Sequence, residues 1–184
     1  RYGRRQRQMC IRDRYMRYYL DALGVEPRDR GLSVMRRFEV ADEGDSSTQV
    51  NSVSVGDIVS VTVTLIAPTN RHQVLVEVPI PAGTEPIDPN LATESEESTG
   101  PTGTLDGPSS PYWYWFQWRP THVDVRDDRV AFYITWLREG TVEFTFQVRA
   151  TIPGEYKVLP AFTEQMYFTD IWGRSSGEMF VVEE

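Results

Sequence analysis

The chain has 184 residues, of which 40% are hydrophobic and 25% charged, and its net charge is −8; this composition suits one globular domain with a core of its own. No run of about 18 apolar residues is present, which excludes a membrane-spanning helix, and no apolar leader opens the chain, so the export signal of an exported parent would lie upstream. Residues 31–184 carry −13 against +5 for residues 1–30, and so acidic a body argues against nucleic-acid binding.

Residues 1–13 do not look like part of a fold. They contain Gln-Arg-Gln-Met-Cys-Ile-Arg-Asp at 6–13, a string that resembles the translation of a sequencing adapter, and we set them aside as a non-native segment. A disordered basic arm is the alternative, since six arginines fall within the first fourteen residues. Cys10 is the only cysteine of the chain, which excludes an internal disulfide framework and a thiolate metal site.

Residues 14–30 precede the regular part of the chain. Segment 15–23 is rich in strand-forming side chains and predicts a strand, with a short helix over 14–23 as the alternative. Residues 24–30 contain Gly24, Pro27 and alternating charges, a composition typical of a linker.

Residues 31–184 are predicted to be all-β, because apolar residues recur with a period of two and helical periodicity is scarce. Between 59 and 65, for example, valine and leucine alternate with serine and threonine, as in a strand with one buried face. Short strands separated by turn residues indicate an immunoglobulin-like or fibronectin-like antiparallel β-sandwich of about seven to eight strands. The expected strands cover 32–40, 59–65, 74–80, 121–126, 130–137, 142–150, 156–158 and 179–182.

Two turns lie at hairpin spacing between the later strands. They are centred on Asp127-Asp128 and Glu139-Gly140. The flanking Arg126 and Arg129 predict local ion pairs with the two aspartates.

Residues 82–111 interrupt the strand rhythm. They hold five prolines, four glycines and an acidic patch, which predicts a mobile insertion; a functional loop is the alternative. Residues 112–118 that follow are almost entirely aromatic. As a strand, this block turns Trp113 and Trp115 to one face and the other aromatic residues to the opposite face. Burial on both faces is one interpretation, and an exposed platform for a sugar or a protein is the other.

Catalytic and metal-binding patterns are weak. Residues 173–177 fit Gly-x-Ser-x-Gly, but no histidine follows Ser175 and a strand–elbow–helix context is missing, so a structural turn is favoured. His72 and His122 are the only histidines, and their separation does not match a zinc motif. We therefore expect no catalytic residue, no cofactor and no metal.

The order of several short motifs resembles the C-terminal region of bacterial alpha-2-macroglobulins, large thioester proteins that trap proteases. No single motif is specific, whereas their order along 31–184 is. The insertion at 84–111 and the aromatic block are less typical of that family. The motifs are Val-Glu-Val-Pro-Ile-Pro-Ala-Gly (76–83), His-Val-Asp-Val-Arg-Asp-Asp-Arg-Val (122–130), Arg-Ala-Thr-Ile-Pro-Gly (149–154), Leu-Pro-Ala-Phe-Thr-Glu-Gln-Met-Tyr (159–167) and Gly-Arg-Ser (173–175).

The resemblance implies a domain organisation and a function. Residues 31–184 would be the C-terminal macroglobulin-like domain, equivalent to the receptor-binding domain, and 14–30 the end of a CUB-type domain plus a linker. The parent would be a broad-range endopeptidase inhibitor of the cell envelope or extracellular space. Cleavage of its bait region triggers a rearrangement, and a thioester, where present, reacts with the protease. This domain, not an enzyme, would pack against the thioester and CUB-type domains.

The expected interdomain contacts lie near the C-terminal motif, at Met166, Tyr167, Trp172 and Arg174. A packed corner for Tyr167 and a positive-φ turn at Gly173 are the structural alternatives. A different function would be a carbohydrate- or surface-binding sandwich of an envelope protein, with Trp113 and Trp115 as its platform. A structural spacer without any ligand is a third reading.

Overall fold

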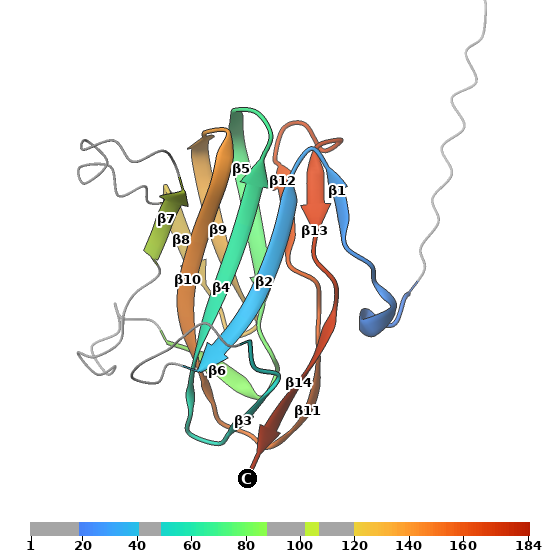
Figure 1. Ribbon diagram of the computed structural model, residues 1–184, viewed down its shortest axis with the longest axis vertical. Coiled ribbons are helices and arrows are strands. Elements are labelled where there is room, and N and C mark those ends of the chain that lie inside the picture. The colour runs from blue at the N-terminus through green and yellow to red at the C-terminus, as the bar shows by residue number, and fades with distance from the viewer. Residues whose placement is uncertain (1–18, 41–48, 88–101, 107–119) are drawn as a thin grey trace, which may run out of the picture.

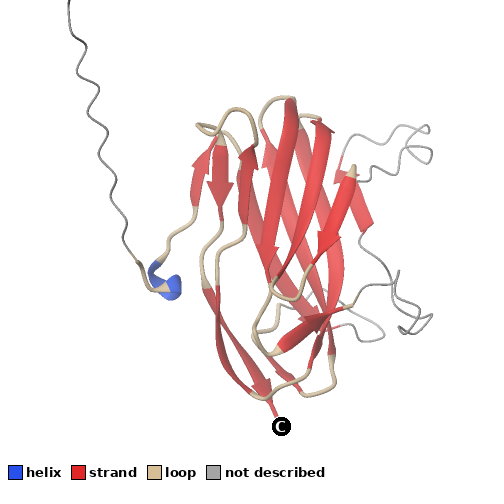
Figure 2. Cartoon of the chain, turned by 180° about the vertical axis from the view of Figure 1, so that it is seen from behind, coloured by secondary structure: helices blue, strands red, loops and turns tan. Residues whose placement is uncertain are grey.

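The structure is a computed structural model that describes residues 19–40, 49–87, 102–106 and 120–184 (Figure 1). Two β-sheets pack face to face and a small third sheet closes one end, as Figure 2 shows from behind. The predicted all-β, largely antiparallel sandwich is confirmed. The expected count of seven to eight strands is wrong, because the described residues form fourteen strands, several of them only three residues long.

The sheets are built as follows. The six-stranded sheet has the order β1 (Arg28–Arg30), β13 (Trp172–Arg174), β12 (Phe162–Gln165), β5 (Arg71–Pro79), β9 (Arg129–Leu137) and β8 (His122–Val125). The five-stranded sheet has the order β2 (Ser33–Val40), β4 (Ile58–Ala67), β10 (Gly140–Ala150) and β6 (Thr84–Pro86), and β7 (Thr102–Asp106) also pairs with β10. The three-stranded sheet has the order β11 (Gly154–Val158), β14 (Glu178–Glu183) and β3 (Ser52–Ser54), the last pair being parallel.

The core lies between the two large sheets. Alternate residues of each strand point inward, as a pleated ladder requires, and the rows predicted at 59–65 and 74–80 are fully buried on their apolar side. Phe132 of β9 stacks on Phe144 of β10, with ring centroids 4.7 Å apart. Rows from opposite sheets therefore interlock at the centre of the sandwich.

The two predicted hairpins have different outcomes. Asp127-Asp128 joins β8 to β9 within one sheet, as expected. The prediction for Glu139-Gly140 is wrong, because β9 and β10 lie in different sheets. Both strands carry a buried apolar row, with Phe132 on β9 and Phe144 and Phe146 on β10, and these rows can pack on each other only if the chain crosses from one sheet to the other.

The ion pairs expected at the first hairpin are also wrong in their partners. Arg126, the residue after β8, binds Asp124 of that strand, with Nε 2.7 Å from Oδ2, and Arg129 lies 3.7 Å from Glu77 on β5. Side chains two apart along an extended segment, or diagonal to each other on neighbouring strands, share a face. The two aspartates of the turn lie outside this alternation of faces.

The N-terminal predictions fail in the described part. Residues 19–23 are not a strand: Asp21 caps a 3-10 turn, η1 (Ala22–Gly24), by accepting a hydrogen bond from the Leu23 N–H at 3.2 Å. The expected linker at 24–30 ends in β1, which pairs with the edge of β13. A strand forms where a ladder partner exists, and β13 supplies one only from Arg28 onward.

The prediction of one continuous loop insertion over 82–111 is wrong at two places, where the chain forms the strands β6 and β7. Both β6 and β7 pair with β10. This strand is eleven residues long, so its edge offers ladder positions at both ends. β7 takes Thr141–Thr145 and β6 takes Val148–Ala150.

Candidate functional site

The loop between β12 and β13, residues 166–171, is named here the tip loop. It exposes three consecutive large apolar side chains: Met166 is 37%, Tyr167 76% and Phe168 63% exposed. The high exposure of Tyr167 rules out the packed-corner alternative. The loop is anchored at its start by the Met166 N–H, which donates to the Gln73 carbonyl at 2.8 Å. Two further backbone bonds fix its interior, from Phe168 N to Gln165 O and from Ile171 N to Phe168 O, each at 2.9 Å.

Trp172 and Arg174 lie on β13, on the outer face of the six-stranded sheet. The structure brings these two predicted contact residues together, since the Arg174 guanidinium lies 5.9 Å from the Trp172 ring. Arg30 of β1 lies 5.8 Å from the same ring, and Phe162 of β12 stacks beside it at 6.1 Å. Met166 and Tyr167 sit on the adjoining tip loop. The predicted contacts therefore form two neighbouring groups.

Gly173 lies between these two residues and faces the opposite way. It is not in the left-handed region, so the positive-φ prediction is wrong. A Cβ atom added there would lie 2.1 Å from the Leu32 carbonyl oxygen. Glycine is needed because β13 crosses the backbone at the start of β2 without room for a side chain.

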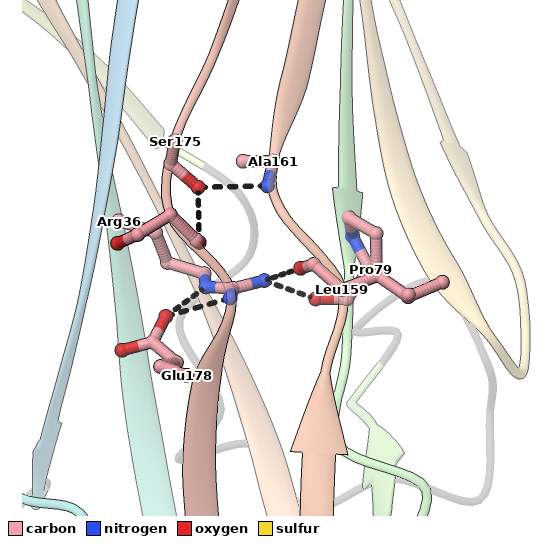
Figure 3. A network of polar contacts seen from close by, with 7 residues as sticks. Arg36, Pro79, Leu159, Ala161, Ser175 and Glu178 are labelled. Carbon is pink, nitrogen blue, oxygen red and sulfur yellow. Dashed lines mark hydrogen bonds and ion pairs between the residues drawn. The ribbon is translucent and has the colours of Figure 1, made fainter. Parts of the chain in front are cut away.

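A buried arginine joins all three sheets (Figure 3). Arg36 lies on β2, its side chain fully buried, and binds Glu178 of β14 through Nε at 2.9 Å and Nη2 at 2.6 Å. Its Nη1 donates to the carbonyls of Pro79 at 2.7 Å and Leu159 at 3.1 Å. Burial lowers the pKa of Arg36, and the charge and hydrogen bond of Glu178 oppose that change. The guanidinium thus satisfies carbonyls that the strand ladders leave unpaired.

Ser175 is also a structural residue. Its buried hydroxyl accepts a hydrogen bond from the Ala161 N–H at 2.9 Å and donates to the Ser176 carbonyl at 3.0 Å (Figure 3). Gly173 and Arg174, expected at the start of a turn over 173–177, belong to β13 instead, and Ser175 leads from it toward β14. The hydroxyl therefore closes a gap between two chain segments.

Replacement of Ser175 by alanine is expected to lower the free energy of unfolding by about 1–3 kcal/mol, because the buried Ala161 N–H loses its acceptor. Urea unfolding followed by circular dichroism measures the change. Ser176→Ala, an exposed neighbour, is the control and should alter stability by less than about 0.5 kcal/mol. Equal effects of the two substitutions would contradict this role.

Each of the two histidines lies next to an aromatic ring. Trp136 packs edge-on against His72 at 4.1 Å, and Tyr133 lies 5.7 Å from His122. Within the described ranges, no three histidine, cysteine, aspartate or glutamate side chains are grouped as metal ligands would be. The same ranges contain no helix long and apolar enough to cross a membrane. Cys10, Trp113 and Trp115 lie outside the described residues, so the predicted aromatic platform stays a prediction.

Comparison with known proteins agrees with this fold. The family model described as "Bacterial Alpha-2-macroglobulin MG10 domain" matches residues 31–170. An alpha-2-macroglobulin homolog of Yersinia pestis is 27% identical over 164 residues, 83% of this chain and 8% of that protein.

Solved structures extend the comparison. The native conformation of Escherichia coli alpha-2-macroglobulin is 25% identical, with a TM-score of 0.66 over 86% of this chain and 10% of that one. The E. coli protein activated by porcine elastase aligns at 23% identity with a TM-score of 0.69, over 87% of this chain and 14% of that one. The chain thus spans only a small part of these relatives. Since the family model covers well over half of its residues, this chain belongs to the bacterial alpha-2-macroglobulin MG10 domain family.

Proposed function

We propose that the chain is the C-terminal interaction module of a bacterial alpha-2-macroglobulin-like endopeptidase inhibitor and docks on sister domains through the tip loop. The observation that carries the proposal is the run Met166–Phe168, three adjacent large apolar side chains in water. Isolated exposed apolar residues are common, but a contiguous group marks a contact surface. In an alpha-2-macroglobulin chain, other domains of the same polypeptide are available to contact such a group.

The tip loop is suited to docking because it is already ordered. Its backbone hydrogen bonds to Gln73 and within the loop hold the side chains in place before any partner arrives. A preorganised loop loses little conformational entropy on binding, and aromatic anchors such as Tyr167 supply much of the energy of an interface. An interdomain contact of about 600–1,500 Å² is the usual size.

The remaining features of the proposed role are carried over from the resemblance to the family. The partners would be the thioester and CUB-type domains of the same polypeptide, with 31–184 as the terminal domain and 14–30 as the junction before it. Target proteases would be met by the whole protein in the cell envelope or outside the cell. The module itself would hold the uncleaved arrangement, without catalysis or a cofactor. Cleavage need shift the docking balance by only a few kcal/mol, about 3–5, to release it.

The test uses the longer polypeptide that carries this chain. Replacing Tyr167 and Phe168 together by alanine is expected to favour the rearranged form before any cleavage, because the docked contact loses its anchors. Native gel migration and small-angle scattering, with and without elastase, measure the shift. A thiol-reactive or amine probe reports the thioester, where one is present.

Met35→Ala is the matched control, since Met35 is 50% exposed on the other sheet. This variant should migrate as the unchanged protein does. The proposal fails if the tip-loop variant keeps the uncleaved form and rearranges only after elastase, as the control does. Circular dichroism of each variant separates a docking defect from unfolding.

A further inference from the structure

The outer face of the six-stranded sheet carries more apolar side chains than is usual for a sheet face in contact with water. Antiparallel sheets that face water normally present polar residues there. Here one cross-strand row contains Arg30, Trp172, Glu164, Leu75 and Tyr133, paired in that order from β1 to β9. The three apolar or aromatic members are neither buried nor fully exposed. The row forms a half-open apolar strip across the sheet.

The neighbouring row also combines arginine, aromatic and acidic side chains, with the arginines at the β1 end. It runs through Arg28, Arg174, Phe162 and Glu77. Three arginines, Arg28, Arg30 and Arg174, therefore gather along β1 and β13, and we name them the arginine edge. The acidic residues of this face lie away from this edge, with Glu164 and Glu77 on the central strands β12 and β5 and Asp124 on the opposite edge strand β8.

The arginine edge lacks carboxylate partners within the described part of the chain. The ion pairs there involve other arginines and Lys157. Among the described residues, the side chain of Arg174 donates to a backbone carbonyl, that of Glu26, at 3.1 Å. Arg28 and Arg174 are direct cross-strand partners, and like charges in that position repel. Among its described residues, a protein with a net charge of −8 thus gathers three arginines without a carboxylate ion-pair partner around a half-exposed tryptophan.

We propose that this face, with the arginine edge at its border, docks a carboxylate-bearing surface of a neighbouring protein domain. The partner would place acidic side chains against Arg28, Arg30 and Arg174 and an apolar patch against Trp172 and Phe162. Arginine is suited to this role because its planar guanidinium binds carboxylates in a two-pronged way and stacks on aromatic rings. The inference rests on the interdomain role proposed above but uses a surface separate from the tip loop.

The same face is a poor match for an anionic membrane. Glu164 is the direct cross-strand partner of Trp172, and Glu77 is that of Phe162. Both carboxylates would meet lipid phosphates at the depth of the aromatic strip. A protein partner can place a donor or a water opposite each carboxylate, so complementary protein chemistry fits the alternation of charges better.

The test uses the 184-residue chain and a synthetic peptide of about twelve residues in which glutamate alternates with leucine, labelled with an uncharged fluorophore. Anisotropy is expected to rise to saturation and to fall with added salt. Arg30→Glu with Arg174→Glu should weaken binding about tenfold or more, because like charges then face each other. Arg149→Glu is the control, because it reverses the charge of an exposed arginine on the other large sheet. It should change peptide affinity less than about twofold. The Trp172 indole N–H signal, assigned by its loss in Trp172→Phe, should shift on titration.

Several results would overturn the inference. They are the absence of saturable binding, equal loss in the Arg149 control, equal binding of a peptide with lysine for glutamate, or arginine-dependent binding to phosphatidylglycerol vesicles in place of the peptide. Concentration-dependent dimerisation lost in the same variants would assign the face to a second copy instead. Tyr167→Ala should leave peptide affinity unchanged. A tip-loop variant without effect on the uncleaved inhibitor would therefore refute the proposed function while the peptide titration still decides this one.

Discussion

Replacement of Arg36 by alanine is expected to lower the free energy of unfolding by about 3–5 kcal/mol, the cost of removing one partner from a buried ion pair. The substitution strands the Glu178 carboxylate, whose side chain is only 19% exposed, and removes the donor of the Pro79 and Leu159 carbonyls. Chemical denaturation, monitored by circular dichroism and tryptophan fluorescence, measures the loss.

Arg37→Ala is the matched control for this prediction. Arg37 lies next in sequence, is 45% exposed and comes only within 3.7 Å of Glu39. The Glu39 carboxylate, 11% exposed, keeps the Thr62 hydroxyl at 3.4 Å, so the loss of Arg37 should cost about 0–1 kcal/mol. The double variant Arg36→Met with Glu178→Leu should recover only part of the stability, because two carbonyl groups still lack a donor. An Arg36→Ala protein as stable as Arg37→Ala would show that the network contributes little.

Replacement of Gly173 by alanine should be nearly as damaging, at about 3 kcal/mol or more, the upper end of the range for overpacking. The new methyl group would lie 2.1 Å from the oxygen and 2.8 Å from the carbon of the Leu32 carbonyl. Both are backbone atoms, so β13 as a whole must move away from β2. The displacement also shifts Trp172 and Arg174, and acidic-peptide affinity should fall with stability.

Gly24→Ala is the control, because nothing lies within 4 Å of the added atom and the backbone there is not left-handed. It should change stability by less than about 0.5 kcal/mol. Thermal unfolding of the two variants side by side gives the comparison. A Gly173→Ala protein with an unchanged melting temperature would mean that the two strands separate at little cost.

The strands of the core could be predicted from the sequence because their alternation is strong. The valine row at 59–65 and the row from Val74 to Val78 lie inside the sandwich as expected, and β10 holds its phenylalanine row on the same interior. The prediction of strands failed where strand formation depends on pairing with a neighbouring strand and not on the local sequence pattern. A three-residue segment such as Arg28–Arg30 has no periodicity to read, and it becomes a strand only because β13 offers a free edge.

The sequence also did not predict where the chain crosses from one sheet to the other. A short turn such as Glu139-Gly140 looks the same in a hairpin as in a crossing between layers. What decides is whether the buried rows on either side pack together, as Phe132 and Phe144 do. That contact depends on two strands at once, which a local window does not contain.

The candidate site was only partly predictable. The C-terminal motif suggested Met166, Tyr167, Trp172 and Arg174 as contact residues, whereas Arg30 and Phe162 reach the surface around Trp172 through strand pairing. Arg36 left a signal that sequence reasoning missed, because it occupies an inward position between Val34 and Phe38. Its partner Glu178 lies 142 residues away, and no local rule connects them.

That separation has a consequence for biosynthesis. At the usual elongation rate of about 5–20 residues per second, the ribosome needs roughly 7–30 seconds after making Arg36 to reach Glu178. Throughout this interval the nascent chain contains the Arg36 guanidinium, which is buried in the folded domain, but not the Glu178 carboxylate that pairs with it. Strand β14 therefore completes the charge balance of the core: until Glu178 is made, Arg36 can be buried only as an interior charge without its carboxylate partner.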